Sequence, residues 1–295
     1  MNYLKQIRLR WIPTVSFFPI LYLLGWILSK PFALIPFLED KDRLELLGTL
    51  FTFSLFLILL PSWAKLRWNQ LKIWPALGFS FKDTKTFVKT FLKGFSIAVG
   101  LISCVLVPIF YGRWGHFVNP LGFIYLWNGV LLGLVVGFAE ELIFRGWLFN
   151  EGKVLLGPTG GIHFQAILFS LSHIVGFIKS DLDLLELIFL LLGLFLLGLV
   201  LGLRRILDRG SISGCIGLHG GLVGLWFFIN ADLIDISRYT PSWLIGPGEL
   251  YPNPIGSFTG ICCLLVILFC YRTAFAIAAR PCNGARNASS RGATP

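Results

Sequence analysis

The chain has 295 residues, of which 56% are hydrophobic and 14% charged, and its mean hydropathy is +0.78. Soluble domains average about 25% charged residues, so this composition excludes a disordered chain and a water-soluble globule and requires lipid as the solvent. The formal net charge of +10 would suggest nucleic acid in a soluble protein. In a membrane protein basic residues gather in cytoplasmic loops, so we expect membrane lipids as partners and no nucleic acid.

The apolar segments predict an all-α fold, a polytopic membrane helical bundle with about eight transmembrane helices. No period-2 pattern of a lipid-facing barrel occurs, which leaves helices as the way to span. In chain order, the predicted spans are Trp11–Leu28, Leu44–Trp63, Gly94–Tyr111, Leu121–Phe138, Ile162–Ile178, Leu184–Leu203, Ile212–Asn230 and Gly256–Ala278.

The distribution of Lys and Arg predicts the orientation. In an eight-span arrangement, the two termini and the loops after the second, fourth and sixth spans lie on one side. Basic residues on that side outnumber those on the other by about three to one. We therefore expect both termini to be cytoplasmic, with a basic amphipathic stretch in the loop Ala64–Lys93.

The chain divides into four predicted parts. N-terminal membrane helices with a basic cytoplasmic loop occupy 1–120, and a catalytic core occupies 121–230. A loop and the last transmembrane helix follow over 231–279. The tail 280–295 is rich in Gly, Ala, Ser and Asn and is expected to be disordered.

Five ionisable residues lie inside the predicted spans or at their ends, where such groups are costly and point to function: Glu140, Glu141, Arg145, His173 and His219. Glu141 and Arg145 are four residues apart, so they share a helix face and can form an ion pair. Glu140 is rotated by about 100° from Glu141 and can face a cavity instead. The histidines lie roughly 16 Å and 11 Å from the cytoplasmic side, which allows one shared cavity in the cytoplasmic half of the membrane.

These residue types suit water activation. A glutamate with reduced solvation suits a general base, and two histidines with a glutamate can bind zinc and leave a position for water. Each group alone has an ordinary explanation, such as helix packing or an interfacial salt bridge, and chains of Glu and His also relay protons in transporters. His116 and His163 are expected to be solvated, and Glu186 lies close to the outer surface.

Three motifs occur in this order: Glu140-Glu141-x-x-x-Arg145-Gly146, Phe169-x-x-x-His173, and a third histidine, His219. They resemble the motifs of the CAAX proteases and bacteriocin-processing enzymes (the CPBP family), polytopic intramembrane proteases that include the type II CAAX prenyl endopeptidases. The resemblance covers roughly Leu121 to Asn230, and the N-terminal third is similar only as generic membrane helices.

The resemblance implies peptide hydrolysis inside the membrane. Glu140 and His173 would activate water, His219 would help to bind the oxyanion or a metal, and Glu141 with Arg145 would hold the site together. Zinc or another divalent metal held by Glu140, His173 and His219 is implied by the usual name of the family, metalloproteases. A metal-free glutamate mechanism is the alternative.

One position departs from the family pattern. The third motif usually has Asn, Asp or a similar polar residue four positions after its histidine, where this chain has Val223. Loss of an oxyanion donor costs about 2.7–4 kcal/mol of transition-state stabilisation. The glycines Gly220 and Gly221 allow close backbone approach, so a backbone N–H is one possible substitute.

These observations predict an intramembrane endopeptidase that cuts a membrane-bound or prenylated protein near the cytoplasmic surface. Two other classes stay open. One is a membrane transporter or ion relay, although no clear inverted repeat is visible. The other is a non-proteolytic membrane scaffold of the same fold.

Overall fold

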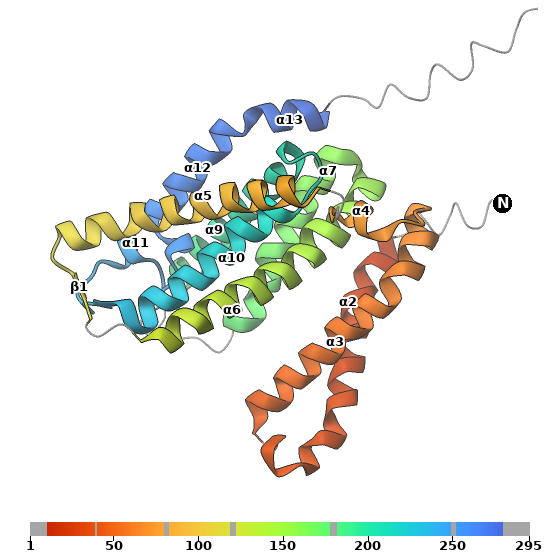
Figure 1. The fold of residues 1–295 in the computed structure, drawn as a ribbon, viewed down its shortest axis with the longest axis horizontal. Coiled ribbons are helices and arrows are strands. Elements are labelled where there is room, and N and C mark those ends of the chain that lie inside the picture. Colours follow the sequence, from red (N-terminus) through yellow and green to blue (C-terminus); the bar gives the residue numbers. More distant parts are fainter. Residues whose placement is uncertain are drawn as a thin grey trace, which may run out of the picture.

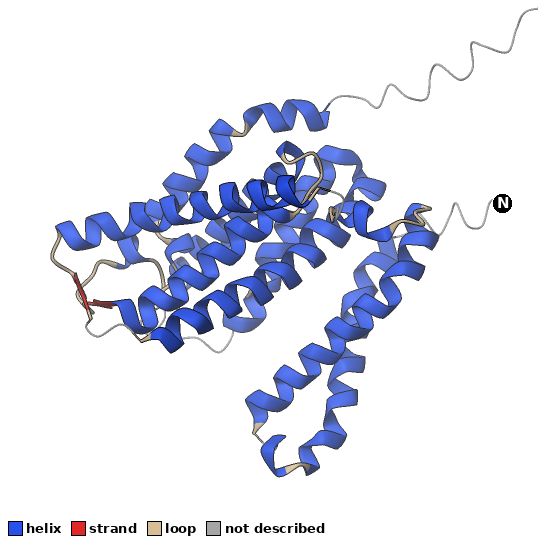
Figure 2. Ribbon diagram, viewed as in Figure 1, coloured by secondary structure: helices blue, strands red, loops and turns tan. Residues whose placement is uncertain are grey.

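The computed structural model describes residues 11–38, 40–79, 83–118, 122–177, 182–248 and 252–279. Helices dominate these residues and strands are confined to two short segments (Figure 2), which confirms the predicted all-α membrane class. The tail predicted to be disordered, 280–295, lies outside the described residues.

The N-terminal part is a helical hairpin that diverges from the rest of the bundle in Figure 1. Its elements are α2 (Trp11–Ser29), the 3-10 turns η1 (Lys30–Leu34) and η2 (Pro36–Leu38), α3 (Lys41–Trp63) and the π-helical η3 (Ala64–Trp68). The side chain of Asp40 accepts hydrogen bonds from the backbone N–H groups of Asp42 and Arg43, which fixes the start of α3.

The central part of the chain contains α4 (Ile73–Leu77), α5 (Thr84–Tyr111), α6 (Phe123–Glu141), the π-helical η4 (Leu142–Leu148), α7 (Phe149–Ser172), α8 (Ile174–Phe177), α9 (Leu184–Leu207) and α10 (Ser213–Phe228). The C-terminal part contains the π-helical η5 (Ile229–Leu233), α11 (Ser242–Ile245), the 3-10 turn η6 (Pro254–Gly256), α12 (Phe258–Cys270) and α13 (Arg272–Ala279). Strands β1 (Gly115–Phe117) and β2 (Ile234–Ile236) pair antiparallel, with His116 opposite Asp235.

Six helical runs among the described residues are long and apolar enough to span a membrane, and α12 is a shorter apolar helix. One run, Phe123–Ser172, is 50 residues long and joins the predicted fourth and fifth spans. Its only non-helical residue is Gly157, at φ 76° and ψ 176°, directly before Pro158. The count of eight spans therefore remains a prediction, and so do the ends at Phe138 and Ile162. The helical run itself continues past Phe138 as far as Gly157, where the backbone leaves the helical conformation before a second helical stretch that ends at Ser172.

Helix α10 lies between α5 and α6 (Figure 1), and small residues determine this position. A Cβ atom on Gly94 of α5 would collide with the backbone of Gly214, and one on Gly133 of α6 would collide with Gly220. Close approach of the helix backbones needs residues without side chains at these points. The glycines of α10 thus bring His219 against the end of α6.

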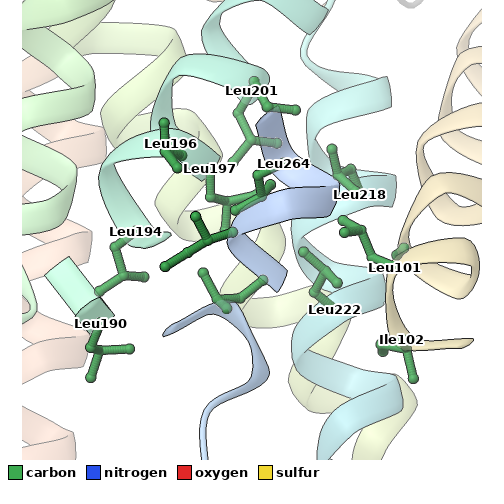
Figure 3. Close-up of a cluster of buried hydrophobic side chains, with 14 of the residues drawn as sticks. Leu101, Ile102, Leu190, Leu194, Leu196, Leu197, Leu201, Leu218, Leu222 and Leu264 are labelled. Carbon is green, nitrogen blue, oxygen red and sulfur yellow. The ribbon is translucent and has the colours of Figure 1, made fainter. Parts of the chain in front are cut away.

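The largest apolar cluster joins α5, α9, α10 and α12 (Figure 3). Leu101 of α5, Leu197 of α9, Leu218 of α10 and Leu264 of α12 are all at most 5% exposed. This cluster fixes α10 from the side opposite α6 and makes the helix that carries His219 one of the most buried elements of the described chain.

A buried charge cluster attaches the hairpin to α7. The carboxylate of Glu151 is fully buried and accepts hydrogen bonds from Thr14 of α2 at 2.5 Å, Trp63 at 3.0 Å and Trp68 at 2.7 Å. The guanidinium of Arg67 lies 2.6 Å from the same carboxylate and is 1% exposed. Because each lone pair and N–H in a low-dielectric interior needs a partner, this cluster ties three helices together at one end of the hairpin.

Candidate active site

The structure brings the five predicted site residues together from four helical elements. Glu140 and Glu141 are the last residues of α6, and Arg145 lies in η4. His173 follows the last residue of α7 with φ −77° and ψ −17°, and His219 lies in the middle of α10. The π-helical turn directly after the two glutamates was not predicted; such segments often occur at functional sites, where they reorient side chains.

Glu141 is fully buried and joins two of the other site residues. Its Oε1 accepts a hydrogen bond from Arg145 at 2.9 Å, which confirms the predicted ion pair, and lies 2.8 Å from Nδ1 of His219. A carboxylate can only accept, so Nδ1 of His219 carries the proton and donates. In the neutral ring, Nε2 of His219 is therefore left with a free lone pair.

His173 also has a hydrogen-bond acceptor beside its Nδ1 atom, but this acceptor is a backbone carbonyl oxygen. Its Nδ1 lies 2.7 Å from the backbone carbonyl oxygen of Phe169, so Nδ1–H donates and Nε2 is unprotonated in the neutral ring. The Phe169 ring makes edge contacts with the His173 and His219 rings, with centroids 4.8 Å and 5.5 Å apart. The guanidinium of Arg145 lies 4.2 Å from the centroid of the same ring. Phe169, seen in the sequence only as a motif residue, thus packs against both imidazoles and against the Arg145 guanidinium.

Glu140 lies between the two imidazoles. Its Oε2 is 4.0 Å from Nε2 of His173 and 3.9 Å from Nε2 of His219, and this oxygen has no hydrogen-bond partner among the described residues. The side chains of Glu140 and His173 are 30% and 26% exposed, whereas that of His219 is 6% exposed. A carboxylate oxygen and two imidazole lone pairs therefore converge at a spacing that leaves room for one small group to interact with all three.

The donor set fits a metal in chemical type. Glu140, His173 and His219 offer one oxygen and two neutral nitrogens, the set that holds catalytic zinc in several hydrolases, and the Nδ1 partners described above give the outer support that metal-binding imidazoles usually have. The described part of the chain holds no group of three His, Cys, Asp or Glu side chains drawn together at metal-ligand spacing. The unpartnered Oε2 of Glu140 and the two free Nε2 atoms are the atoms that would bind such an ion.

Val223, the departure from the family pattern, lies in the same cavity as the two histidines. Gly220 and Gly221 do not face it, because Gly220 packs against the backbone of α6 and Gly221 against Phe95 and Ala98 of α5. Both glycines are in the interior of α10, where each N–H is committed to the helix. Neither glycine N–H is available as the substitute donor considered from the sequence.

Two further residues, Arg205 and Glu186, differ from the sequence interpretation. Arg205, placed in a loop by the sequence, is 4% exposed because α9 continues to Leu207; it donates to the carbonyl oxygens of Arg145, Ala76 and Gly210. Glu186 forms a capping box with Asp183 at the start of α9. A signal for this box existed in the Asp-x-x-Glu spacing, whereas nothing local indicates that Arg205 is buried.

His116 and His163 lie outside the site. His116 is paired with Asp235 across the strands and 75% exposed, and His163 lies on the exposed side of α7. Both side chains are exposed on the surface of the protein, and their contact with water remains a prediction.

The fold and the site define a polytopic helical membrane protein with a buried glutamate–histidine centre. Residues 121–225 match the family described as Type II CAAX prenyl endopeptidase Rce1-like, and residues 1–72 match a domain of unknown function, DUF8676. Residues 121–225, which contain all five site residues, thus form a domain of the CAAX protease family, and the resemblance inferred from the motifs is confirmed. Neither curated proteins nor solved structures give a match to the chain.

Proposed function

We propose that the protein is an intramembrane endopeptidase that hydrolyses a peptide bond of a membrane-associated or lipidated protein, and that both of its termini are cytoplasmic. The family match supports proteolysis in general. The observation that carries the specific proposal is the position of Glu140 Oε2, unpartnered and about equally distant from the unprotonated Nε2 atoms of His173 and His219.

The arrangement suits activation of a water molecule. Water bound between Glu140 and His173 would give a proton to the carboxylate while its oxygen attacks the carbonyl carbon of the peptide bond. The proton would then pass from Glu140 to the leaving nitrogen as the C–N bond breaks, giving a new carboxyl group and a new amine. Because Nε2 of neutral His219 accepts and cannot donate, His219 can stabilise an oxyanion only in its doubly protonated form.

A divalent metal such as zinc, when bound, would polarise the attacked carbonyl and acidify the water, and Glu140, His173 and His219 would hold it. Glu141 and Arg145 serve as positioning residues in either case. Glu141 fixes the tautomer and orientation of His219, and Arg145 neutralises the Glu141 carboxylate in a site where a single buried charge would be costly.

The test uses the purified full-length chain in liposomes with a panel of membrane-anchored peptides, unmodified, acylated or prenylated. We expect a new amino terminus, detected by mass spectrometry, in at least one class of peptide. Loss of cleavage with a zinc chelator, and its recovery with added zinc, would assign a metal; cleavage that persists would assign the metal-free route. Proton flux without cleavage of any peptide would favour the ion-relay alternative instead.

Replacement of Val223 by asparagine tests the missing donor. Val223 shares the cavity with His173 and His219, so an amide there can donate to the developing oxyanion. One such donor is worth roughly 10²–10³ in rate, and the gain should appear in kcat because the charge exists only in the transition state. A Val223→Ala variant changes the cavity volume without adding a donor and should not reproduce the gain. An unchanged or lower kcat for Val223→Asn would show that another group already fills the role.

A further inference from the structure

The cavity that contains the histidines is mostly apolar. It has a volume of about 340 Å³, and we call it the histidine chamber. In addition to His173, His219 and Val223, its walls are formed by Leu132, Leu194, Leu197, Leu222, Trp226 and Phe227. These residues come from α6, α9 and α10, and those of α10 follow His219 in the direction of β2.

The histidine chamber adjoins a larger, polar cavity at the β1–β2 end of the bundle. This strand-side vestibule has a volume of about 1000 Å³ and shares Asn230, Ala231 and Pro252 with the chamber. Polar and charged residues line it, among them Asp235 of β2 and Arg238. The two cavities therefore lie side by side, with Asn230, Ala231 and Pro252 in the wall that both share, and the strand-side vestibule is next to the cavity of the histidines.

The opposite direction, toward α4, is closed. Leu77 of α4, Leu142 of η4 and Ile212 before α10 are fully buried and belong to one apolar cluster. Arg205 stabilises this layer, because its guanidinium donates hydrogen bonds to the carbonyl oxygen of Arg145 in η4 and to that of Ala76 in α4.

Beyond the closed layer lies a third cavity of about 1010 Å³, the basic cavity, which is lined by Lys72, Lys153, Arg205 and Arg209 among others. None of the five site residues lines it. The face of the protein that is rich in Lys and Arg therefore has a large cavity without a connection to the site among the described residues.

We propose that the substrate reaches the site from the β1–β2 face, with an apolar side chain next to the scissile bond in the histidine chamber and a polar flanking segment in the strand-side vestibule. This inference rests on the proposed proteolytic function. The sequence predicts cleavage near the cytoplasmic surface. With the basic face in the cytoplasm, the proposed path instead begins at the opposite face of the membrane.

The walls of the chamber also restrict the substrate, because apolar side chains form most of them. Hydrolysis further needs a peptide bond whose carbonyl carbon is open to the attacking water. An extended segment presents single side chains and an accessible peptide bond. The substrate class is thus an extended peptide segment next to a membrane anchor, with an apolar residue at the cleavage position.

Cysteine labelling from each side of the membrane tests this path. Of the six native cysteines, Cys215 is fully buried and can be kept, and the others are replaced by serine. Single cysteines are then introduced by Val223→Cys in the chamber, Asn230→Cys where chamber and vestibule meet, and Ser211→Cys in the basic cavity as the matched control. Sealed vesicles of both orientations receive a charged, membrane-impermeant thiol reagent.

We expect the Asn230→Cys and Val223→Cys thiols to react only from the side opposite to the one that labels the Ser211→Cys control, with at least a tenfold difference in rate between the vesicle orientations. Reaction of Val223→Cys from the control side, or from neither side, would overturn the proposal. Thermal unfolding of each variant identifies any that does not fold, and Asn230→Cys, at a half-buried position, serves if Val223→Cys fails. Labelling does not depend on catalysis, so the two proposals can be judged separately. Labelling can contradict the access path while peptide cleavage is still observed, and cleavage can be absent while labelling supports the access path.

Discussion

Replacement of Glu140 by glutamine is expected to lower kcat for peptide hydrolysis by about 10²–10⁴-fold, the usual contribution of a positioned general base. Glutamine keeps the volume of the side chain and can still bind water, but its amide cannot take up the proton that water must lose. The KM for the substrate should change little, because Glu140 interacts with the attacking water rather than with the bulk of the peptide.

The measurement is kcat and KM for a cleaved membrane-anchored peptide in liposomes. Glu45→Gln is the matched control, since Glu45 lies on the exposed surface of α3 and its side chain is 57% exposed. The control should retain full activity. If Glu140→Gln cleaves at the wild-type rate, Glu140 is not the base, and the water-activation mechanism built on it is wrong.

Removal of the Glu151 carboxylate is expected to cost about 3–5 kcal/mol of folding free energy, which is typical when one partner of a buried ion pair is lost. Glu151→Ala leaves the guanidinium of Arg67, which is 1% exposed, without its carboxylate, and it leaves two indole N–H groups without their acceptor. The free energy of unfolding in detergent micelles, or the change in Tm, measures this loss.

Two comparisons make this result specific. The surface variant Glu45→Ala removes an exposed pair with Lys41, whose atoms are 3.9 Å apart, and should cost no more than about 0.5 kcal/mol. The double variant Glu151→Leu with Arg67→Met removes both charges and should lose less stability than Glu151→Ala, because no unpaired charge stays buried. Equal losses for Glu151→Ala and Glu45→Ala would mean that the buried cluster does not attach the hairpin.

These two predictions concern separate functions of the buried charges. The side chain of Glu140 is 30% exposed and its Oε2 has no hydrogen-bond partner among the described residues, an arrangement that leaves this oxygen free to bind water. Glu151 has donors on both oxygens and is fully enclosed, which suits attachment of the hairpin to α7. The difference lies in the hydrogen-bond partners, not in the residue type.

The composition and the periodicity of the sequence determined the helical membrane class, since a chain so poor in charge can be stable only with lipid around it. Local spacing determined the Glu141–Arg145 ion pair, because residues four apart lie on one face whatever the rest of the chain does. The same argument, applied to polar groups inside apolar segments, selected Glu140, His173 and His219, and the structure places them around one point.

Only the tertiary structure decided the features that depend on distant partners. Two adjacent glutamates resemble the end of a transmembrane helix, yet the helix continues past them because Arg145 and His219 neutralise and bind Glu141. Arg205 resembles a loop residue, yet it is buried because three carbonyl oxygens from separate segments accept its hydrogen bonds. In both cases distant groups add to the partners that lie nearby in the chain. His219 does so for Glu141, and the carbonyl oxygens of Arg145 and Ala76 do so for Arg205, and no local pattern contains these groups.

The tautomers of the histidines and the direction from which the site can be reached also depend on the tertiary structure. Which nitrogen of His173 or His219 carries the proton depends on the acceptor that the fold puts beside Nδ1, a carbonyl oxygen in one case and a carboxylate in the other. The depth of the histidines in their helices follows from the sequence, but whether a path leads from them to one face or the other depends on which side chains fill the space between helices. Packing is a property of the assembled bundle, so the sequence determined the residues of the site, and the fold decided how they face one another and from where they can be reached.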